Sequence, residues 1–334
     1  MIKKRNLDNS LIQWIMTQSG IGPGIGKIHY VARADSTARQ YRAWLQDMGV
    51  EIDNELHTGV AAGYNAMQSY RNDVMLLYPA WYNTAAFAWA KHKTFLFGMN
   101  PGMTMGSYGS YGTVIYQSVT TAGYTMDMSG SYNVFKNVGI HAYGNAATAL
   151  SALKLNGTNS RFEGCDILGI GGTTAGASAN TAALWVPAES DHGRECEFIN
   201  CGFRDANAAR TAAAGGIILF GTPGSDGGNC GVDMRFIGCR IRSRSDTAGC
   251  HLVAIRSPMD GLIEWKDCTF YNHAPNQGTT LTDAFYVGAS GTYVHVLRNC
   301  NLSRITAWQG EDTGYIYTAD ADCHATGGAV AEAT

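Results

Sequence analysis

The chain has 334 residues, which suffices for one elongated domain or two ordinary ones. Only 15% of them are charged, against roughly 25% in a typical soluble protein, and glycine is abundant at 41 residues. A net charge of −3 argues against a general nucleic-acid surface, which would need clustered basic residues, and no stretch approaches the length of a membrane span.

Residues 1–26 are predicted to form an arm that ends in a Gly-rich hinge. The segment starts with basic residues and continues with the apolar fragment LIQWIM, which is too short and interrupted for a signal peptide. An apolar segment on a flexible tether is typical of a docking arm, but it would serve equally as a cap over the open end of a repeat protein. If the arm docks, the expected partner contacts are Lys3, Lys4, Arg5, Trp14 and Ile15.

Residues 27–101 are predicted to form an α/β capping region and the first coil of a repeat. Residues 27–32 have the pattern of a strand, and residues 37–48 carry apolar side chains at helical spacing. Further along, NDVMLLYPAWY (72–82) indicates a strand and a turn, and TFLFG (94–98) indicates a strand that ends in glycine.

Residues 102–318 contain a repeated cysteine unit. Each of five cysteines lies three residues after a bulky apolar residue and two residues before another, as in RFEGCDI and EFINCGF. The interval is roughly 30–40 residues, which is typical of a solenoid whose repeats bury their apolar faces only against their neighbours. The five are Cys165, Cys201, Cys239, Cys268 and Cys300.

A second short apolar run precedes each cysteine unit, so each coil is expected to hold at least two strands joined by polar turns. The Gly-rich insertions at 169–180 and 221–231 fall between these runs. Apolar spacing of two and a nearly constant coil predict an all-β chain folded as a parallel β-helix. Residues 319–334 lose the pattern and are predicted to be an exposed or partner-stabilised C-terminal tail.

The strings at 72–82 and 94–98, together with the cysteine units, resemble pectate-lyase-like right-handed β-helices. In that family a short capping helix leads into a strand and turn of the form GDxIxLxPGxY; here Ala80 takes the place of the turn glycine. The resemblance covers about residues 57–305. It implies a right-handed parallel β-helix, to which the sequence adds the short N-terminal arm and the α/β capping region described above. It implies little about function, because lyases, hydrolases and virion structural proteins share this fold.

The five repeated cysteines are predicted to form a ladder of small core side chains. Disulfides along the ladder are disfavoured, because stacked strands lie about 4.8 Å apart whereas a disulfide needs Cβ atoms near about 3.8 Å. The disulfide state of the other four stays open, and no metal is predicted, because His192, Cys196 and Cys201 lack the spacing of a zinc site. The four are Cys196, Cys230, Cys250 and Cys323.

No catalytic motif and no cofactor are predicted. The glycine cluster at 19–27 lacks the pattern of a phosphate-binding loop, and the acids form no paired string. Carboxylates brought together from separate coils would leave no local motif, so an active site stays open. Its acids would come from Glu189, Asp191, Asp205, Asp226, Asp233, Asp246, Asp260, Asp267 and Asp283, and its aromatic platforms from Trp185, Trp265, Tyr271, Tyr286, Tyr293 and Trp308.

Two functional hypotheses follow. The first is a non-enzymatic virion structural protein, a capsid decoration or cement protein or a head fibre, made in the host cytoplasm and located in the virion. Its expected partner is the major capsid protein or another virion protein, with self-association as a homo-oligomer such as a trimer, and with no nucleic acid or membrane. The alternative is a phage tailspike or a polysaccharide lyase or hydrolase that binds a glycan along the β-helix groove.

Overall fold

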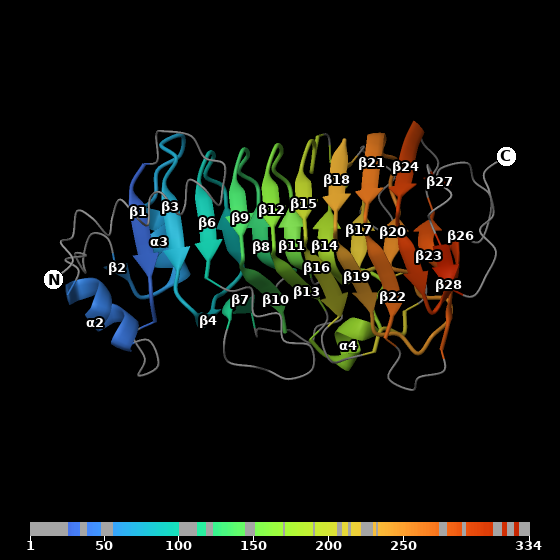
Figure 1. Ribbon diagram of the computed structural model, residues 1–334, viewed down its shortest axis with the longest axis horizontal. Helices are drawn as coiled ribbons and strands as arrows, with labels where there is room; N and C mark the ends of the chain where they lie inside the picture. Colours follow the sequence, from blue (N-terminus) through green and yellow to red (C-terminus); the bar gives the residue numbers. More distant parts are fainter. Residues whose placement is uncertain are drawn as a thin grey trace.

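The protein, described by a computed structural model, is a rod of stacked coils (Figure 1). The structure describes residues 26–33, 39–47, 56–99, 112–117, 123–143, 151–169, 171–189, 191–205, 209–212, 215–221, 230–231, 233–273, 279–288, 292–309, 316–318 and 324–326. Every strand pair in these ranges is parallel, and each full coil gives one strand to each of three sheets. The chain is therefore a right-handed parallel β-helix, as predicted.

The three sheets are named A, B and C in the order in which each coil crosses them. Sheet A, in spatial order, consists of β2 Leu56–His57, β1 Ile28–Val31, β3 Val74–Leu77, β6 Phe95–Gly98, β9 Val134–Lys136, β12 Arg161–Glu163, β15 Glu197–Ile199, β18 Met234–Ile237, β21 Asp260–Lys266, β24 Thr292–Arg298 and β27 Ile316–Thr318. Sheet B consists of β4 Ala80–Asn83, β7 Thr113–Gln117, β10 Gly139–Ala142, β13 Asp166–Gly169, β16 Gly202–Asp205, β19 Arg240–Ser243, β22 Thr269–Asn272, β25 Asn301–Ser303 and β28 His324–Thr326. Sheet C consists of β5 Phe87–Trp89, β8 Tyr124–Met128, β11 Ser151–Leu155, β14 Ala182–Val186, β17 Ile218–Phe220, β20 Val253–Ile255, β23 Leu281–Val287 and β26 Ile305–Gln309.

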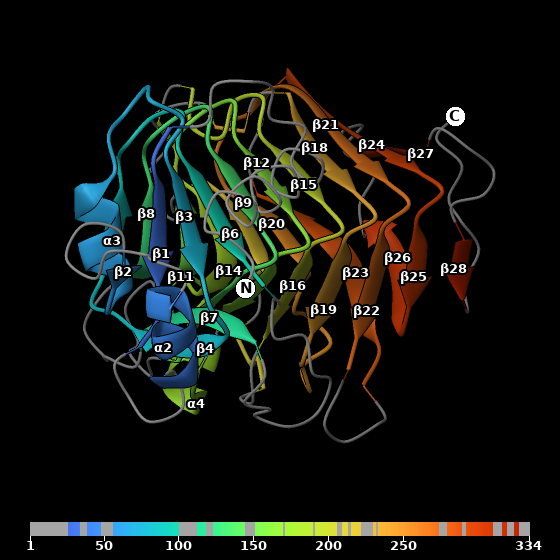
Figure 2. The same cartoon turned by 60° about the vertical axis from the view of Figure 1, so that its left-hand side comes forward.

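The N-terminal end carries two of the three helices that the described residues form, α2 Arg39–Asp47 and α3 Val60–Ala66, with α4 Thr173–Gly176 further along the rod (Figures 1 and 2). Asp73 ties this end together: its buried carboxylate accepts hydrogen bonds from the backbone of Lys27 and Gln68 and from the guanidinium of Arg71. None of the described helices is long and apolar enough to span a bilayer.

Aromatic rings fill the interior beside sheet A. Phe135, Phe162, Phe198, Phe236 and Trp265 occupy one register column, with neighbouring ring centroids 4.1–5.0 Å apart and ring planes within 18° of parallel. Each ring stacks on the ring of the next coil, because parallel pairing places equivalent residues directly above one another. The apolar residue three positions before each repeated cysteine is therefore a core position.

The repeated cysteines lie at the corner between sheets A and B, not within a strand. All five are buried free thiols, and each Sγ donates to a carbonyl of the preceding coil, as from Cys239 to Phe198 at 3.3 Å. The apolar spacing around each cysteine thus spans the end of one strand, a corner and the start of the next. This corner is always two residues long from β9–β10 to β24–β25, whereas the connections from B to C and from C to A vary.

The residue before each of these cysteines adopts a left-handed backbone, with φ between 47° and 63°. Glycine, asparagine and aspartate reach this region at the lowest cost, and these types occupy the column: Gly164, Asn200, Gly238, Asp267 and Asn299. Asparagine side chains cover the glycines, since a Cβ on Gly238 would lie 2.4 Å from Asn200 Oδ1.

Replacing Gly238 with alanine is expected to lower the free energy of unfolding by about 2 kcal/mol, because φ is positive and the methyl group meets Asn200. Urea denaturation followed by circular dichroism measures this. Gly59→Ala is the matched control: φ there is −158°, and nothing lies within 4 Å of the added Cβ. Equal losses in the two variants would contradict this account of the corner.

A buried histidine makes the stability depend on pH. His295 accepts a hydrogen bond at Nδ1 from Trp265 Nε1 at 3.0 Å, and burial lowers its pKa to about 3. The unfolded chain, with a histidine pKa of about 6.5, binds more protons between these values, so stability falls as pH falls below about 6.5. We expect this residue to lower the free energy of unfolding by about 2 kcal/mol when the pH falls from 7 to 5. Urea denaturation of the wild type and of His295→Gln at both pH values measures it; an unchanged pH dependence in the variant would contradict it.

Candidate functional site

The outward side of sheet B brings chemically active side chains together from separate coils. One outward column runs through Tyr116, His141, Leu168, Arg204 and Arg242, and continues to Tyr271. The inward column beside it is apolar and includes Ile140, Ile167, Phe203, Ile241 and Phe270. Alternation along each strand therefore separates a core face from a polar face, which we call the outer B face.

Asp166 is the centre of the outer B face. Its carboxylate lies 2.9 Å from His141 Nε2 and accepts two hydrogen bonds from the Arg204 guanidinium, at 2.9 and 2.6 Å. These side chains come from β13, β10 and β16, on three successive coils. Gly202, which is in register with Asp166, leaves space there, because a Cβ on it would lie 3.2 Å from Asp166 Oδ1.

The environment keeps Asp166 ionised. Burial by itself would raise the pKa of this carboxyl, but the hydrogen bonds and charges of His141 and Arg204 outweigh burial and hold the pKa below its usual value. The same pairing raises the pKa of the Arg204 guanidinium against the effect of burial. At neutral pH Asp166 is thus a carboxylate that can orient a histidine, and it holds no proton to donate as a general acid.

An aromatic group adjoins His141. Nδ1 of His141 lies 3.2 Å from the Tyr143 hydroxyl, and the Tyr143 ring stacks on Trp81 with centroids 5.8 Å apart. Trp81 also meets the rings of His141 and Tyr116 edge-on, at 6.1 and 5.6 Å. Tyr143, His141 and Asp166 therefore form a hydrogen-bonded chain in which a carboxylate orients an imidazole, the arrangement that a general base needs.

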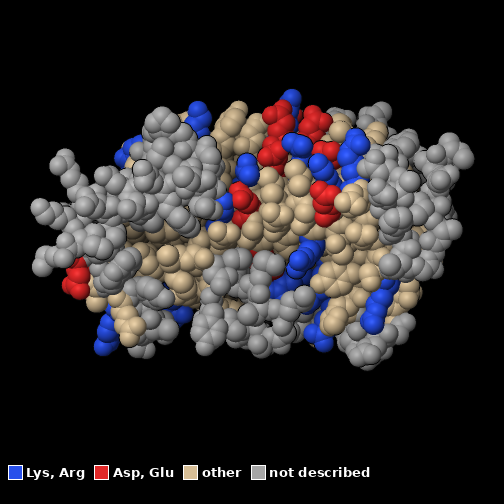
Figure 3. Space-filling model, in the orientation of Figure 1, with Lys and Arg blue, Asp and Glu red and all other residues tan. Residues whose placement is uncertain are grey.

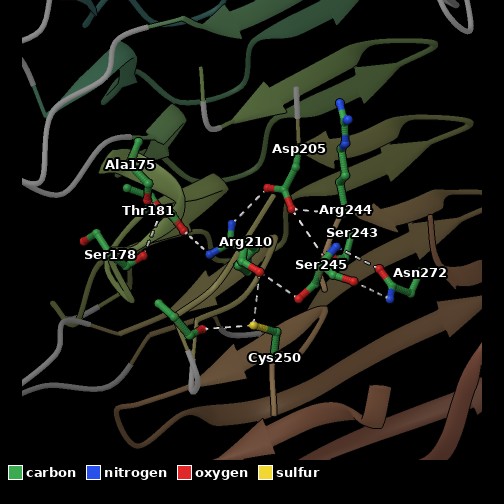
Figure 4. Close-up of polar contacts among 11 residues, drawn as sticks. Ala175, Ser178, Thr181, Asp205, Arg210, Ser243, Arg244, Ser245, Cys250 and Asn272 are labelled. Carbon is green, nitrogen blue, oxygen red and sulfur yellow. Dashed lines mark hydrogen bonds and ion pairs between the residues drawn. The ribbon is translucent and has the colours of Figure 1, made fainter. Parts of the chain in front are cut away.

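A second polar cluster lies inside the rod and is structural (Figure 4). Arg210 and Asp205, both fully buried, form an ion pair with Nη2 and Oδ1 3.0 Å apart. Nη1 of Arg210 also donates to the Thr181 carbonyl at 2.9 Å. The Arg210 carbonyl accepts hydrogen bonds from Ser245 Oγ at 2.8 Å and Cys250 Sγ at 3.6 Å. These contacts tie the connection after β16 to the neighbouring coils.

Three of the acids proposed from sequence lie in separate contacts and not in one site. Asp205 is paired in the interior, Asp267 accepts a hydrogen bond from Asn299 at the corner, and Asp191 pairs with Arg194. Within the described ranges, no group of three or more His, Cys, Asp or Glu side chains is placed to hold a metal ion. Asp226, like the arm residues Lys3, Lys4, Arg5, Trp14 and Ile15, lies outside the described residues.

Of the proposed aromatic platforms, Tyr271 lies on the outer B face in register with Arg242. Trp185 lies on sheet C, 5.4 Å from the Lys154 ammonium, and Tyr286 lies 5.8 Å from the Arg256 guanidinium. Trp265 and Trp308 belong to the core. Sequence reasoning missed His141, Asp166 and Arg204 because each stands alone in its own coil.

Comparison with known proteins identifies the fold. No protein-family model matches the chain, and no curated protein matches it. Among solved structures, it is similar to a pectin methylesterase in complex with a hexasaccharide (12% identity, TM-score 0.56, covering 92% of this chain and 90% of that one). It is also similar to a pectin methylesterase from carrot (14%, 0.54, 94% and 90%) and overlaps less well with ORF18 of Geobacillus virus E2 (12%, 0.41, 88% and 62%). At these identities the likeness shows the fold alone.

Proposed function

We propose that this protein is a non-enzymatic structural protein of a virion, a capsid decoration or cement protein or a head fibre, built as a stiff rod. The observation that carries the proposal is the pairing of charged side chains between coils. On the outward side of sheet A, Glu197, Arg235, Glu264 and Arg298 form a continuous ladder with contacts of 2.9–3.2 Å. Each exposed pair of this kind contributes at most about 1 kcal/mol, so the ladder favours the alignment of neighbouring coils and adds to their packing.

The other two regions support the same role. On the outer B face Asp166 pairs with side chains from both neighbouring strands, and in the interior Arg210, which is paired with Asp205 of its own coil, donates to the Thr181 carbonyl of the preceding coil. In this proposal these charged groups hold adjacent coils in place and take no part in catalysis.

The experiment is the copy number of this chain in purified particles, measured by quantitative mass spectrometry against the major coat protein. A ratio comparable to that of the coat protein supports decoration or cementing. A few copies per particle would indicate a location in a tail or spike, and absence of the chain from particles would refute the proposal. The predicted arm is tested alongside: deleting residues 1–20 should abolish particle binding and leave the circular dichroism spectrum unchanged.

The second candidate is a glycan-processing enzyme, and the chain from Tyr143 through His141 to Asp166 favours it. A similar fold binds a hexasaccharide in a pectin methylesterase, so an oligosaccharide is the substrate class to assay. Release of methanol and of reducing ends from methylated pectin would be measured for the wild type and for Tyr143→Phe. Activity in the wild type that is lost in Tyr143→Phe would support this candidate. A wild type without activity, or a variant that keeps the activity, would refute it.

A further inference from the structure

Three arginines form a row on the outer B face. Arg240 and Arg242 alternate in β19 with the inward residues Ile241 and Ser243, and Arg244 follows directly. Alternate residues of a strand project from the same side at intervals of about 6.6 Å. Arg240 is exposed, and Arg242 and Arg244 are half-buried. The strand and the residue after it thus place three arginine side chains on the same side of sheet B.

The row has no counter-ion within the part of the chain that the structure describes. None of the three guanidinium groups lies within 4.0 Å of a described carboxylate, and Nε of Arg242 and of Arg244 is buried without a hydrogen-bond partner. Sheet A differs sharply, because Arg235 and Arg298 there pair with glutamates of neighbouring strands. Positive charge left unpaired and partly desolvated favours an external anionic partner.

Neighbouring coils add to the charge. Arg304, which follows β25, is exposed as well, and burial together with the charges of Arg242, Arg244 and Arg304 lowers the pKa of His273, so this histidine is neutral. Tyr271 is in register with Arg242 and offers an aromatic ring beside the row. In Figure 3 the charged side chains that show in the lower half of the molecule, right of centre, are mostly blue among tan and grey surface, whereas those above them are mixed red and blue.

We propose that Arg240, Arg242 and Arg244 form the docking surface for an extended acidic segment of a partner protein, with carboxylates on alternate residues. An extended segment presents alternate side chains about 6.6–6.8 Å apart, the same interval as the arginine row. Guanidinium groups bind carboxylates through two parallel hydrogen bonds, and tyrosine and arginine are the side chains that contribute most at protein interfaces. The proposal rests on the structural role above, in which another virion protein holds the rod.

A nucleic-acid strand fits the row less well. Proteins that bind one commonly use six or more phosphate contacts, roughly twice what this row supplies, and this chain has a net charge of −3. A sugar polymer that carries carboxylates would share the guanidinium chemistry but not the alternation of an extended peptide. The peptide and polygalacturonate probes described below therefore distinguish such a polymer from an acidic peptide.

The test compares two triple variants of the full-length chain. In one, Arg240, Arg242 and Arg244 are each changed to Gln; in the matched control, Arg161, Arg235 and Arg298 of sheet A are each changed to Gln, which removes the same charge. Binding is measured by co-sedimentation with particles produced without this chain. We expect the sheet B variant to bind at least about tenfold more weakly than wild type, and the control to bind within about threefold of it. Circular dichroism establishes that both are folded.

A second measurement uses defined probes. A synthetic peptide with glutamate at alternate positions should bind the wild type more tightly than a peptide of the same composition with consecutive glutamates, and the sheet B variant should bind neither. Particle binding that is equal in the two triple variants would overturn the docking surface and leave the structural role standing. If the wild-type protein does not bind particles but binds the alternating peptide more tightly, the docking surface is supported and the structural role is refuted. Wild type that binds polygalacturonate but shows no preference between peptides would assign the row to a sugar acid and overturn the proposal.

Discussion

Arg210→Ala is expected to lower the free energy of unfolding by about 3 to 5 kcal/mol. The side chain and its partner Asp205 are both fully buried, so the variant leaves a carboxylate without its cation in a low-dielectric interior. Burial already raises the pKa of Asp205 against the opposing effect of Arg210. The variant also removes the hydrogen bond to the Thr181 carbonyl, which leaves a second buried acceptor unpaired.

Urea denaturation followed by circular dichroism at pH 7 provides the measurement, and Arg235→Ala is the matched control. Arg235 also pairs with carboxylates of neighbouring coils, but its side chain is 49% exposed. Exposed pairs contribute about 0–1 kcal/mol, so the control should lose no more than that. A loss for Arg210→Ala as small as that of the control would show that the buried pair is not a main source of stability.

Phe198→Ala is expected to cost about 3 to 5 kcal/mol, because it removes a fully buried ring from the middle of the aromatic stack. The ring stacks on Phe162 at 4.7 Å and on Phe236 at 5.0 Å, and it meets Phe203 edge-on at 5.3 Å. Each repeat in a solenoid is stabilised mainly by its neighbours, so a cavity here weakens two interfaces at once.

The adjacent position supplies the control. Ile199 lies on the same strand but points outward and is only half-buried, so Ile199→Ala should cost less than about half as much. Thermal unfolding monitored by circular dichroism would rank the two variants. Similar melting temperatures for Phe198→Ala and Ile199→Ala would contradict the stack as the main source of coil-to-coil stability.

Sequence alone predicted the β-helix because the signal for a coil is local and repeats. The apolar residue three positions before each cysteine gave the core column of Phe162, Phe198 and Phe236, and the cysteine marked the same point in each coil. One further signal was present and unused: glycine, asparagine or aspartate precedes each cysteine, as a left-handed corner requires. It would have placed the cysteine at a corner and not within a strand.

The outer B face could not be predicted in this way. His141, Asp166 and Arg204 are separated by 25 and 38 residues, and the connections between them differ in length. Their contact depends on the vertical register of three coils, which the local pattern does not encode. The buried pair of Arg210 with Asp205 posed a related difficulty, because a charged residue in a loop is usually solvated and nothing adjacent in sequence marks it as internal.

The two-residue corner between sheets A and B has a consequence for how such a chain can change. A corner of constant length keeps equivalent residues of successive coils aligned, so length differences in the other two connections do not disturb the register of the strands. Insertions along those two edges would leave the shaft intact, whereas one residue added between Gly164 and Cys165 would turn the side chains of β13 to the wrong faces. The rod is thus a scaffold with one edge closed to insertion and two edges on which new loops can be displayed.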